Sequence, residues 1–316
     1  MFIERPGCPV CAGTDTTIVY DQPYTDNAIR TYLTNYYDLE LRNFDYNAVF
    51  AGHNFTLKLC TACKAITQHL APDDELSTMV YSDWIDGGGG EEKRLKRHPF
   101  SEYTHHIQEA MIITAFLLRH TGKRSPRDLR VFDFGLGWSR WGMAMKACGC
   151  EVAGTDISPP RNEHARANGI TVLEYADIPH QAFDFINTEQ VFEHLPAPRE
   201  TARHLVQGLS PKGVLKISVP YCRWLEGRTL LIDWSAARYA TRSPMPVAPL
   251  EHLNYFQRPS LNVLAAQIEL HEVRYSASTE LNYAFNWSSP RQVAKNLLRP
   301  IGRKWWRNYY LFSRKG

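Results

Sequence analysis

Apolar runs and amphipathic stretches alternate along the second half of the chain. Five short apolar runs have the length of β-strands: 129–135, 151–157, 170–176, 183–188 and 213–220. Three stretches between them have the character of helices: 138–148, 159–168 and 198–209. Ahead of the first run, apolar positions between Tyr103 and His120 follow helical spacing. This alternation predicts an α/β fold with a parallel sheet covered by helices on both faces.

The pattern changes after Pro220. About forty residues follow without clear periodicity, and a helix is then predicted near 260–269. Two strand-like segments, 272–278 (EVRYSAS) and 308–314 (NYYLFSR), lie near the end of the chain. Both are candidate strands.

The first strand ends in a glycine turn. In LRVFDFGLGWSR (129–140), Gly135 and Gly137 follow the apolar run, and a helix is predicted to begin just after them. A strand, a glycine turn and a helix N-terminus together bring backbone N–H groups against a ligand. Asp156 lies 21 residues after Gly135, at the end of the next predicted strand. An acid there can accept hydrogen bonds from both ribose hydroxyls, so the two features predict a cofactor that contains adenosine.

These motifs resemble those of the class I S-adenosylmethionine-dependent methyltransferases. The D-x-G-x-G-like loop at 133–139 is similar to motif I of that family, with Ser139 in the place of the last glycine. The segments FDFINTEQVFEHL (183–195) and SPKGVLKISVP (210–220) are similar to its fourth strand and to its fifth strand with the preceding turn. The resemblance covers roughly residues 105–316. It implies a Rossmann-like sheet of seven mostly parallel strands with an antiparallel last strand.

The resemblance also implies a set of cofactor contacts. Asp133 would support the glycine turn or the ammonium group of the methionine part, Asp156 the ribose, and Asp177 the adenine amino group. The full set of residues expected to bind S-adenosylmethionine is Asp133, Gly135, Gly137, Trp138, Ser139, Asp156, Ile157, Asp177, Ile178, Thr188, Glu189 and Gln190. A nicotinamide-dependent oxidoreductase is disfavoured, because Arg140 occupies the position of the third glycine in the dinucleotide fingerprint.

Two C-x-x-C pairs lie in the N-terminal part of the chain. Cys8 and Cys11 form the first pair, and Cys60 and Cys63 form the second. Four thiolates make a closed tetrahedral site that is typical of structural Zn²⁺. Buried free cysteines and a redox motif are the alternatives, and twin pairs favour the metal. The zinc is interpreted as structural because four protein ligands leave no open position.

The segment between the pairs is rich in aromatic residues. TYLTNYYDLELRNFDY (31–46) could line a substrate groove or fill the core of a small subdomain. A connector follows the second pair, and Gly87–Gly90 within it could be the hinge of a lid or an exposed loop. The predicted domains are therefore a zinc-binding subdomain over 1–70, a connector and a cofactor-covering helix over 71–125, and a methyltransferase domain over 126–316 with a substrate-side insert at about 221–258.

Composition adds limits on location and partners. The chain has 316 residues, of which 44% are hydrophobic and 22% are charged, and no apolar run is long enough to span a bilayer. We therefore expect a cytoplasmic protein without a transmembrane segment. The net charge of +3 hides an asymmetry, because residues 291–316 carry eight Lys and Arg and no acid. This basic C-terminal segment could bind RNA, a membrane surface or a phosphorylated substrate, or it could be a solvated surface.

Candidate catalytic residues follow the fourth and fifth strands. His194 directly follows the fourth strand and is the first candidate for a general base, while Glu193 would orient the loop. Tyr221 follows the fifth strand, and His252 and Tyr255 lie in an H-x-x-Y-F segment. That segment is similar to one in zinc-bearing sugar and natural-product methyltransferases.

The predicted function is methyl transfer from S-adenosylmethionine to a small molecule, namely a sugar, a nucleotide-linked sugar or a natural-product intermediate. O-methylation is preferred to C-methylation, because a single histidine base suffices for it. One alternative is an RNA methyltransferase that uses the basic C-terminal segment, and another is a scaffold that binds the cofactor without turnover. The acceptor and the oligomeric state are left open.

Overall fold

A computed structural model describes residues 1–85, 99–220, 232–237, 240, 242–283, 290, 293–294, 297–298 and 309–314. The chain divides into two compact units. The first consists of three segments, Met1–Glu91, Phe192–Arg199 and Pro220–Leu264. The second consists of the remainder, Glu92–Val191, Glu200–Val219 and Ala265–Gly316. Tyr221 and Gly87–Gly90 lie outside the described residues, as does most of the basic C-terminal segment.

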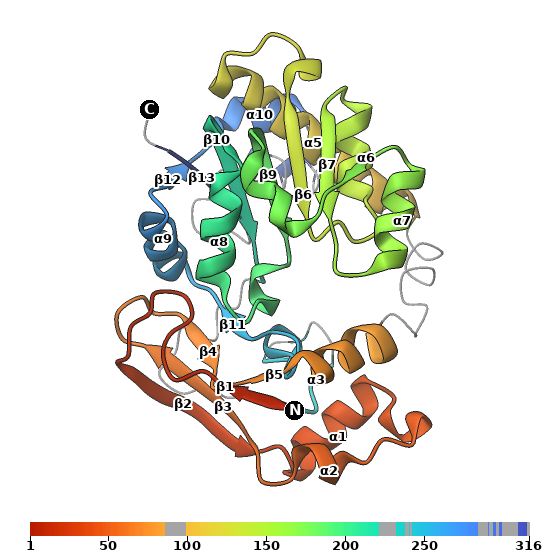
Figure 1. The fold of residues 1–316 in the computed structure, drawn as a ribbon, viewed down its shortest axis with the longest axis vertical. Coiled ribbons are helices and arrows are strands. Elements are labelled where there is room, and N and C mark those ends of the chain that lie inside the picture. The colour runs from red at the N-terminus through yellow and green to blue at the C-terminus, as the bar shows by residue number, and fades with distance from the viewer. Residues whose placement is uncertain are drawn as a thin grey trace. The chain divides into compact units, whose positions relative to one another are not determined.

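The second unit is built on a seven-stranded sheet (Figure 1). Its strands are β6 (Arg130–Phe134), β7 (Glu151–Thr155), β8 (Thr171–Val172), β9 (Phe183–Glu189), β10 (Leu209–Ser218), β12 (His271–Val273) and β13 (Tyr309–Ser313). Their order across the sheet is β12-β13-β10-β9-β6-β7-β8. The pairs from β10 to β8 are parallel, and β13 runs antiparallel to both of its neighbours. The predicted sheet of mostly parallel strands with an antiparallel last strand is confirmed.

Helices cover both faces of this sheet. The helices of this unit are α5 (Pro99–Thr121), α6 (Arg140–Ala147), α7 (Pro159–Ala167), α8 (Pro198–Gln207) and α10 (Ala277–Asn282). The helix α9 (Arg258–Gln267) begins in the first unit and ends in the second. Residues of α5, α6 and α7 pack with Val131, Phe185 and Val214 in one buried cluster. In Figure 1, α8 lies on the opposite face of the sheet from α5.

Two local predictions in this unit were only partly right. The run 170–176 contains the two-residue strand β8, after which Tyr175–His180 forms a 3₁₀ turn. The segment 272–278 is a strand only at its start. Ser276 accepts a hydrogen bond from the N–H of Thr279 and caps α10, so the local capping interaction takes the chain into a helix.

The first unit contains a four-stranded sheet with the order β11-β4-β3-β2 and a separate antiparallel pair of β1 and β5. The strands are β1 (Phe2–Glu4), β2 (Thr16–Pro23), β3 (Asn54–Cys60), β4 (Ile66–Gln68), β5 (Leu70–Pro72) and β11 (Asn254–Tyr255). The helices are α1 (Asn27–Tyr36), α2 (Tyr46–Phe50), α3 (Asp74–Thr78) and a π-helical stretch at Met79–Ile85, with 3₁₀ turns at Leu39–Arg42, Phe192–His194 and Met245–Val247.

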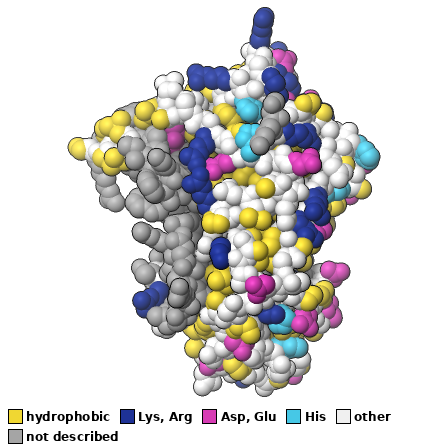
Figure 2. Space-filling view, turned by 90° about the vertical axis from the view of Figure 1, so that its left-hand side faces the viewer, with side chains coloured by type: hydrophobic (Ala, Val, Ile, Leu, Met, Phe, Trp, Pro, Cys, Tyr) yellow, Lys and Arg dark blue, Asp and Glu magenta, His cyan; other side chains and the backbone are white. Residues whose placement is uncertain are grey.

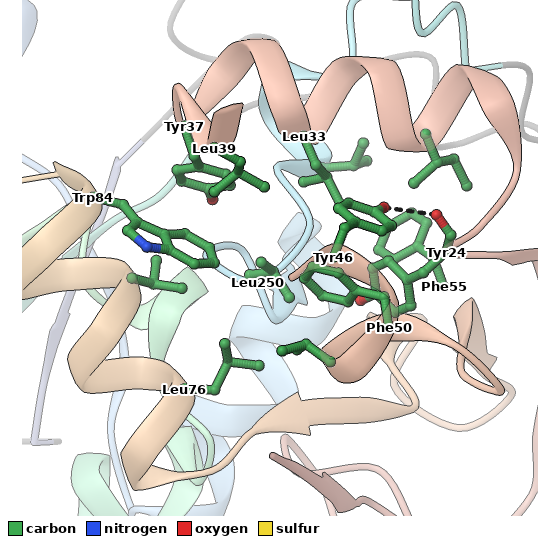
Figure 3. Packing of buried hydrophobic residues seen from close by; sticks show 14 of the residues in the cluster. Tyr24, Leu33, Tyr37, Leu39, Tyr46, Phe50, Phe55, Leu76, Trp84 and Leu250 are labelled. Carbon is green, nitrogen blue, oxygen red and sulfur yellow. Dashed lines mark hydrogen bonds between the residues drawn. The ribbon is translucent and has the colours of Figure 1, made fainter. Parts of the chain in front are cut away.

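The core of the first unit is aromatic (Figure 3). Tyr24, Tyr37, Tyr46 and Phe50 are all buried, and the hydroxyl of Tyr46 donates to the carbonyl of Tyr24 at 2.7 Å. Tyr37 and Tyr46 belong to the aromatic-rich segment 31–46, so at these two positions the segment fills a core rather than lining a groove. Among the described residues, no helix combines the length and apolarity needed to cross a membrane.

Candidate active site

The glycine turn after β6 has the geometry of a ligand-binding loop. Gly135 and Gly137 have positive φ values of 81° and 50°, and a Cβ at Gly135 would lie 2.6 Å from the side chain of Val191. Glycine is therefore required at Gly135 on both conformational and steric grounds. Ser139 also adopts a left-handed conformation, with φ of 57°, and its side chain is buried. The turn leads directly into α6, as the sequence predicted.

Asp156 is coupled to this turn. One carboxylate oxygen accepts the N–H of Gly137 at 2.8 Å, and the other accepts the N–H of Ser158 at 3.0 Å and lies 3.5 Å from Arg161. A carboxylate has about four acceptor positions, so these contacts leave capacity for a hydroxyl. Ile157, beside it, is 82% exposed and accessible to a ligand. The structure thus places the predicted ribose acid and the glycine turn in direct contact.

Asp133 is a buried acid at the end of β6. Its carboxylate accepts a hydrogen bond from the side-chain amide of Asn187 at 2.7 Å. Burial raises the pKa of Asp133 to about 7, although the Asn187 hydrogen bond and Lys216 act in the opposite direction. The group can therefore change its charge near neutral pH.

This pKa gives a testable pH dependence. If the ionised carboxylate supports the ammonium of the cofactor, affinity for S-adenosylhomocysteine is expected to rise about tenfold from pH 6 to pH 8, as Asp133 loses its proton. The Asp133→Asn variant should bind more weakly at pH 8 and show a flat profile over the same range. Calorimetric titration at several pH values measures both. A wild-type profile as flat as that of the variant would contradict this role.

A lysine lies inside the sheet next to the predicted cofactor residues. Lys216 on β10 is 1% exposed, and its ammonium contacts Glu109 of α5 at 2.7 Å and Glu189 at the end of β9 at 2.5 Å. Glu189 also accepts from the hydroxyl of Ser218 at 2.8 Å. Burial would lower the pKa of Lys216, but the two carboxylates outweigh it and raise that pKa above its ordinary value. Sequence reasoning missed Lys216 and Glu109, although a lysine within an apolar strand was the available signal.

The other residues predicted to bind the cofactor differ in burial and in their contacts. Thr188 is buried and donates to the carbonyl of Lys216 at 2.8 Å. Gln190 has φ of 54°, and its backbone N–H donates to the carbonyl of Ser218 at 2.9 Å. Asp177 is exposed on the 3₁₀ turn after β8, and Ile178 beside it is fully buried. Trp138 packs edge-on against His164 of α7. Their contacts with a cofactor stay predictions.

Two of the predicted catalytic residues meet in the first unit. The rings of His194 and His252 lie 4.8 Å apart between centroids, although 58 positions separate them in the chain. The Nδ1 atom of His194 lies 2.9 Å from the carbonyl oxygen of Glu251, and that of His252 lies 2.9 Å from the carbonyl oxygen of Pro246. A carbonyl oxygen only accepts, so each Nδ1 carries the proton and each Nε2 carries a lone pair.

The surroundings keep both imidazoles neutral. Burial and the neighbouring His252 lower the pKa of His194 to about 3, and burial lowers the pKa of His252 to about 4. The hydroxyl of Tyr81 lies 3.0 Å from Nδ1 of His194. Tyr255, the fourth predicted catalytic residue, donates to the carbonyl of Val247 at 2.8 Å and accepts from the amide of Gln68 at 3.1 Å. A catalytic role for any of these residues stays a prediction.

The four predicted zinc ligands converge in the first unit. The Sγ atoms of Cys8 and Cys63 lie 3.6 Å apart, those of Cys11 and Cys60 lie 3.5 Å apart, and all four lie within 4.8 Å of one another. Sulfurs bound to one tetrahedral zinc at 2.3 Å would lie about 3.8 Å apart. The donor set and its spacing therefore fit zinc.

The two cysteine turns also have the same backbone geometry. The N–H of Ala12 donates to the carbonyl of Cys8, and the N–H of Lys64 donates to the carbonyl of Cys60. In each turn the next N–H points at a sulfur, from Gly13 to Cys11 at 3.4 Å and from Ala65 to Cys63 at 3.5 Å. Such N–H donors stabilise thiolate charge.

Comparison with known proteins identifies the family. Residues 103–273 match the sequence profile of a methyltransferase domain family. This match spans more than half of the chain, and the chain belongs to this methyltransferase family. Together with the strand order of the second unit, the match defines a class I methyltransferase that uses S-adenosylmethionine. No curated protein matches the chain.

Several solved structures are similar to the chain. One is a TehB-like SAM-dependent methyltransferase from Corynebacterium glutamicum ATCC 13032 Kitasato, with 18% identity, a TM-score of 0.37, and coverage of 66% of this chain and 88% of that chain. Another is the plantazolicin methyltransferase BpumL in complex with a pentazolic desmethylPZN analog and SAH, with 13% identity, a TM-score of 0.47, and coverage of 76% and 95%. A third is the magnesium protoporphyrin IX methyltransferase (ChlM) from Synechocystis PCC 6803 with bound SAM, with 13% identity, a TM-score of 0.45, and coverage of 78% and 99%.

Proposed function

We propose that this methyltransferase methylates a hydroxyl group of a small molecule, such as a sugar, a nucleotide-linked sugar or a natural-product intermediate. The observation that carries the proposal is the pair of neutral histidines, His194 and His252, whose rings lie 4.8 Å apart between centroids. His194 follows the predicted cofactor residues at the end of β9. A hydroxyl acceptor must lose a proton during methyl transfer, and an imidazole with a free lone pair can receive it.

S-adenosylmethionine, which the glycine turn and Asp156 would hold, would supply an electrophilic methyl group to the acceptor oxygen. The bond from sulfur to the methyl carbon would break as the oxygen–carbon bond formed, and S-adenosylhomocysteine would leave. His194 is the first candidate to take the hydroxyl proton on Nε2, since its Nδ1–H is held by the carbonyl of Glu251. The carboxylate of Glu193 lies 3.9 Å from this Nε2 and would stabilise the imidazolium that forms. His252, Tyr221 and Tyr255 are the other proposed bases.

We also propose that the four cysteines bind one structural Zn²⁺. Their spacing, their N–H···S contacts and their burial support this assignment, and four ligands leave no position for a substrate. Residues 1–102 lie outside the methyltransferase match, so the proposed metal site would be an addition to the matched domain.

An RNA acceptor, bound through the basic C-terminal segment, is the alternative. On the face shown in Figure 2, Lys and Arg side chains are interspersed with acidic, apolar and uncharged ones. RNA binding through the basic C-terminal segment would fall steeply as salt rises, whereas binding of a neutral small molecule would not.

Two measurements test the proposed function. Calorimetry should show micromolar binding of S-adenosylhomocysteine and no binding of NADH. Transfer of a labelled methyl group to a panel of nucleotide sugars and phenolic natural products should then identify the acceptor class. With the acceptor that wild type methylates, His194→Gln should lower kcat by about 10² or more with little change in cofactor affinity. Unchanged kcat would remove His194 from the mechanism, and failure to bind the thioether would refute the proposed function.

A further inference from the structure

The strongest unassigned feature outside the four-cysteine site is a second group of metal-ligating side chains. Glu193, His194 and His252 each offer one ligand atom, and the three atoms lie within 4.8 Å of one another. All three residues belong to the first unit, and the backbone N–H of Leu253 donates to the carbonyl of Glu193 at 2.6 Å. This bond ties the two contributing segments together beside the group.

We propose that Glu193, His194 and His252 bind a divalent transition-metal ion. Two imidazoles and one carboxylate form a recurring ligand set for such ions, and three protein ligands leave positions open for water or a substrate. The group therefore differs in kind from the four-cysteine site, in which every position is filled by the protein.

The hydrogen bonds of the two histidines support this assignment. A histidine ligand typically donates its other ring N–H to a carbonyl or carboxylate, which fixes the tautomer and the ring orientation. Here the Nδ1–H of His194 points at the carbonyl of Glu251, and the Nδ1–H of His252 points at that of Pro246. Both Nε2 lone pairs are left for a cation. The second shell of a metal site is thus already in place on both ligands.

Distance and burial agree with the same assignment. Ligand atoms on one ion at about 2.1 Å can lie up to about 4.2 Å apart. Nε2 of His194 lies 3.9 Å from a carboxylate oxygen of Glu193, and the widest separation in the group is below 4.8 Å, so side-chain movements of less than about 1 Å close the site. Glu193 is 1% exposed whereas His194 is 25% exposed, so the group is open on the histidine side.

The role of the ion rests on the proposed hydroxyl acceptor and would replace the base role of His194, whereas binding of the ion depends on neither. Bound beside a hydroxyl acceptor, a cation would lower the pKa of that hydroxyl and hold its oxygen for attack. The two histidines would then serve as ligands rather than as the proton acceptor. In that case the released proton passes to solvent.

The test uses the full chain with the four-cysteine site filled by zinc, and Co²⁺ as the probe. Equilibrium dialysis followed by elemental analysis should show one additional Co²⁺ per chain, without the intense thiolate-to-cobalt absorption that a cysteine site would give. His252→Asn and Glu193→Gln should each weaken Co²⁺ binding at least tenfold. The matched control His53→Asn, a histidine of the same unit outside the group, should bind like wild type.

Thermal melting of each variant shows whether it is folded, and Glu193→Gln keeps the shape of the side chain if His252→Asn does not fold. Absence of a second bound ion in folded wild type, or Co²⁺ binding by the folded variants as tight as that of wild type, would overturn the proposal. S-adenosylhomocysteine binding is measured on the same samples. If folded wild type binds the second Co²⁺ but does not bind S-adenosylhomocysteine, the proposed function is refuted and the proposed metal site is supported.

Discussion

The double variant Cys60→Ser/Cys63→Ser is expected to lose its zinc and the ordered structure of the first unit. Cys60 ends β3 and Cys63 lies in the turn that follows, and their sulfurs lie 3.5 and 3.6 Å from those of Cys11 and Cys8. Apparent zinc-binding free energies of small structural sites are about 10–16 kcal/mol, and this energy is coupled to folding. This binding free energy is as large as the whole free energy of unfolding of a typical small domain, so its loss is expected to lower the melting temperature strongly.

Elemental analysis and thermal melting measure this result. The matched control is Cys148→Ser, which changes a partly buried cysteine of the second unit outside the four-cysteine group. The control should keep one zinc per chain and melt within a few degrees of wild type. The assignment fails if the double variant retains the same zinc content and melting temperature as the control.

The second large effect is expected at Asp156. Replacing it with alanine removes the predicted acceptor for the ribose hydroxyls and the hydrogen bond at 2.8 Å to the N–H of Gly137. Hydrogen bonds to a charged group contribute about 1.5–3 kcal/mol each, so two of them correspond to an affinity loss of a hundredfold or more. Calorimetric titration with S-adenosylhomocysteine measures the change.

An exposed acid on the following helix gives the control. Glu163→Ala on α7 removes a negative charge from the same region without touching the glycine turn, and its affinity should match wild type. If Asp156→Ala binds the thioether as tightly as Glu163→Ala does, Asp156 does not hold the ribose.

The sequence predicted those parts of the site that local chemistry determines. Gly135 is recognisable because its backbone conformation and the nearby Val191 exclude other residues, and Asp156 follows at a spacing that the strand and helix lengths impose. The two C-x-x-C pairs were recognisable for a similar reason, since each forms a self-contained turn. Such local patterns can be recognised in a sequence without knowledge of tertiary contacts.

The sequence indicated the two histidines His194 and His252 but not the contact between their rings. Each histidine was a separate candidate, but their convergence depends on the hydrogen bond between Leu253 and Glu193, which no local pattern encodes. Glu193 was assigned only to loop orientation for the same reason. Lys216 was missed because an apolar strand pattern does not reveal that carboxylates from α5 and β9 surround one of its members.

The three-segment composition of the first unit has a consequence for synthesis on the ribosome. Arg5 is buried and donates to the carbonyl of Gln68 at 2.6 Å and to the carbonyl of Leu253 at the same distance. The strand β11 at Asn254–Tyr255 completes the sheet that β2 begins. The segment around Arg5 and β2 therefore cannot reach its final structure until Leu253 and β11 have been synthesised, because its last partners are encoded there. During that interval, early metal capture by the cysteine turns would protect the nascent N-terminal segment from aggregation.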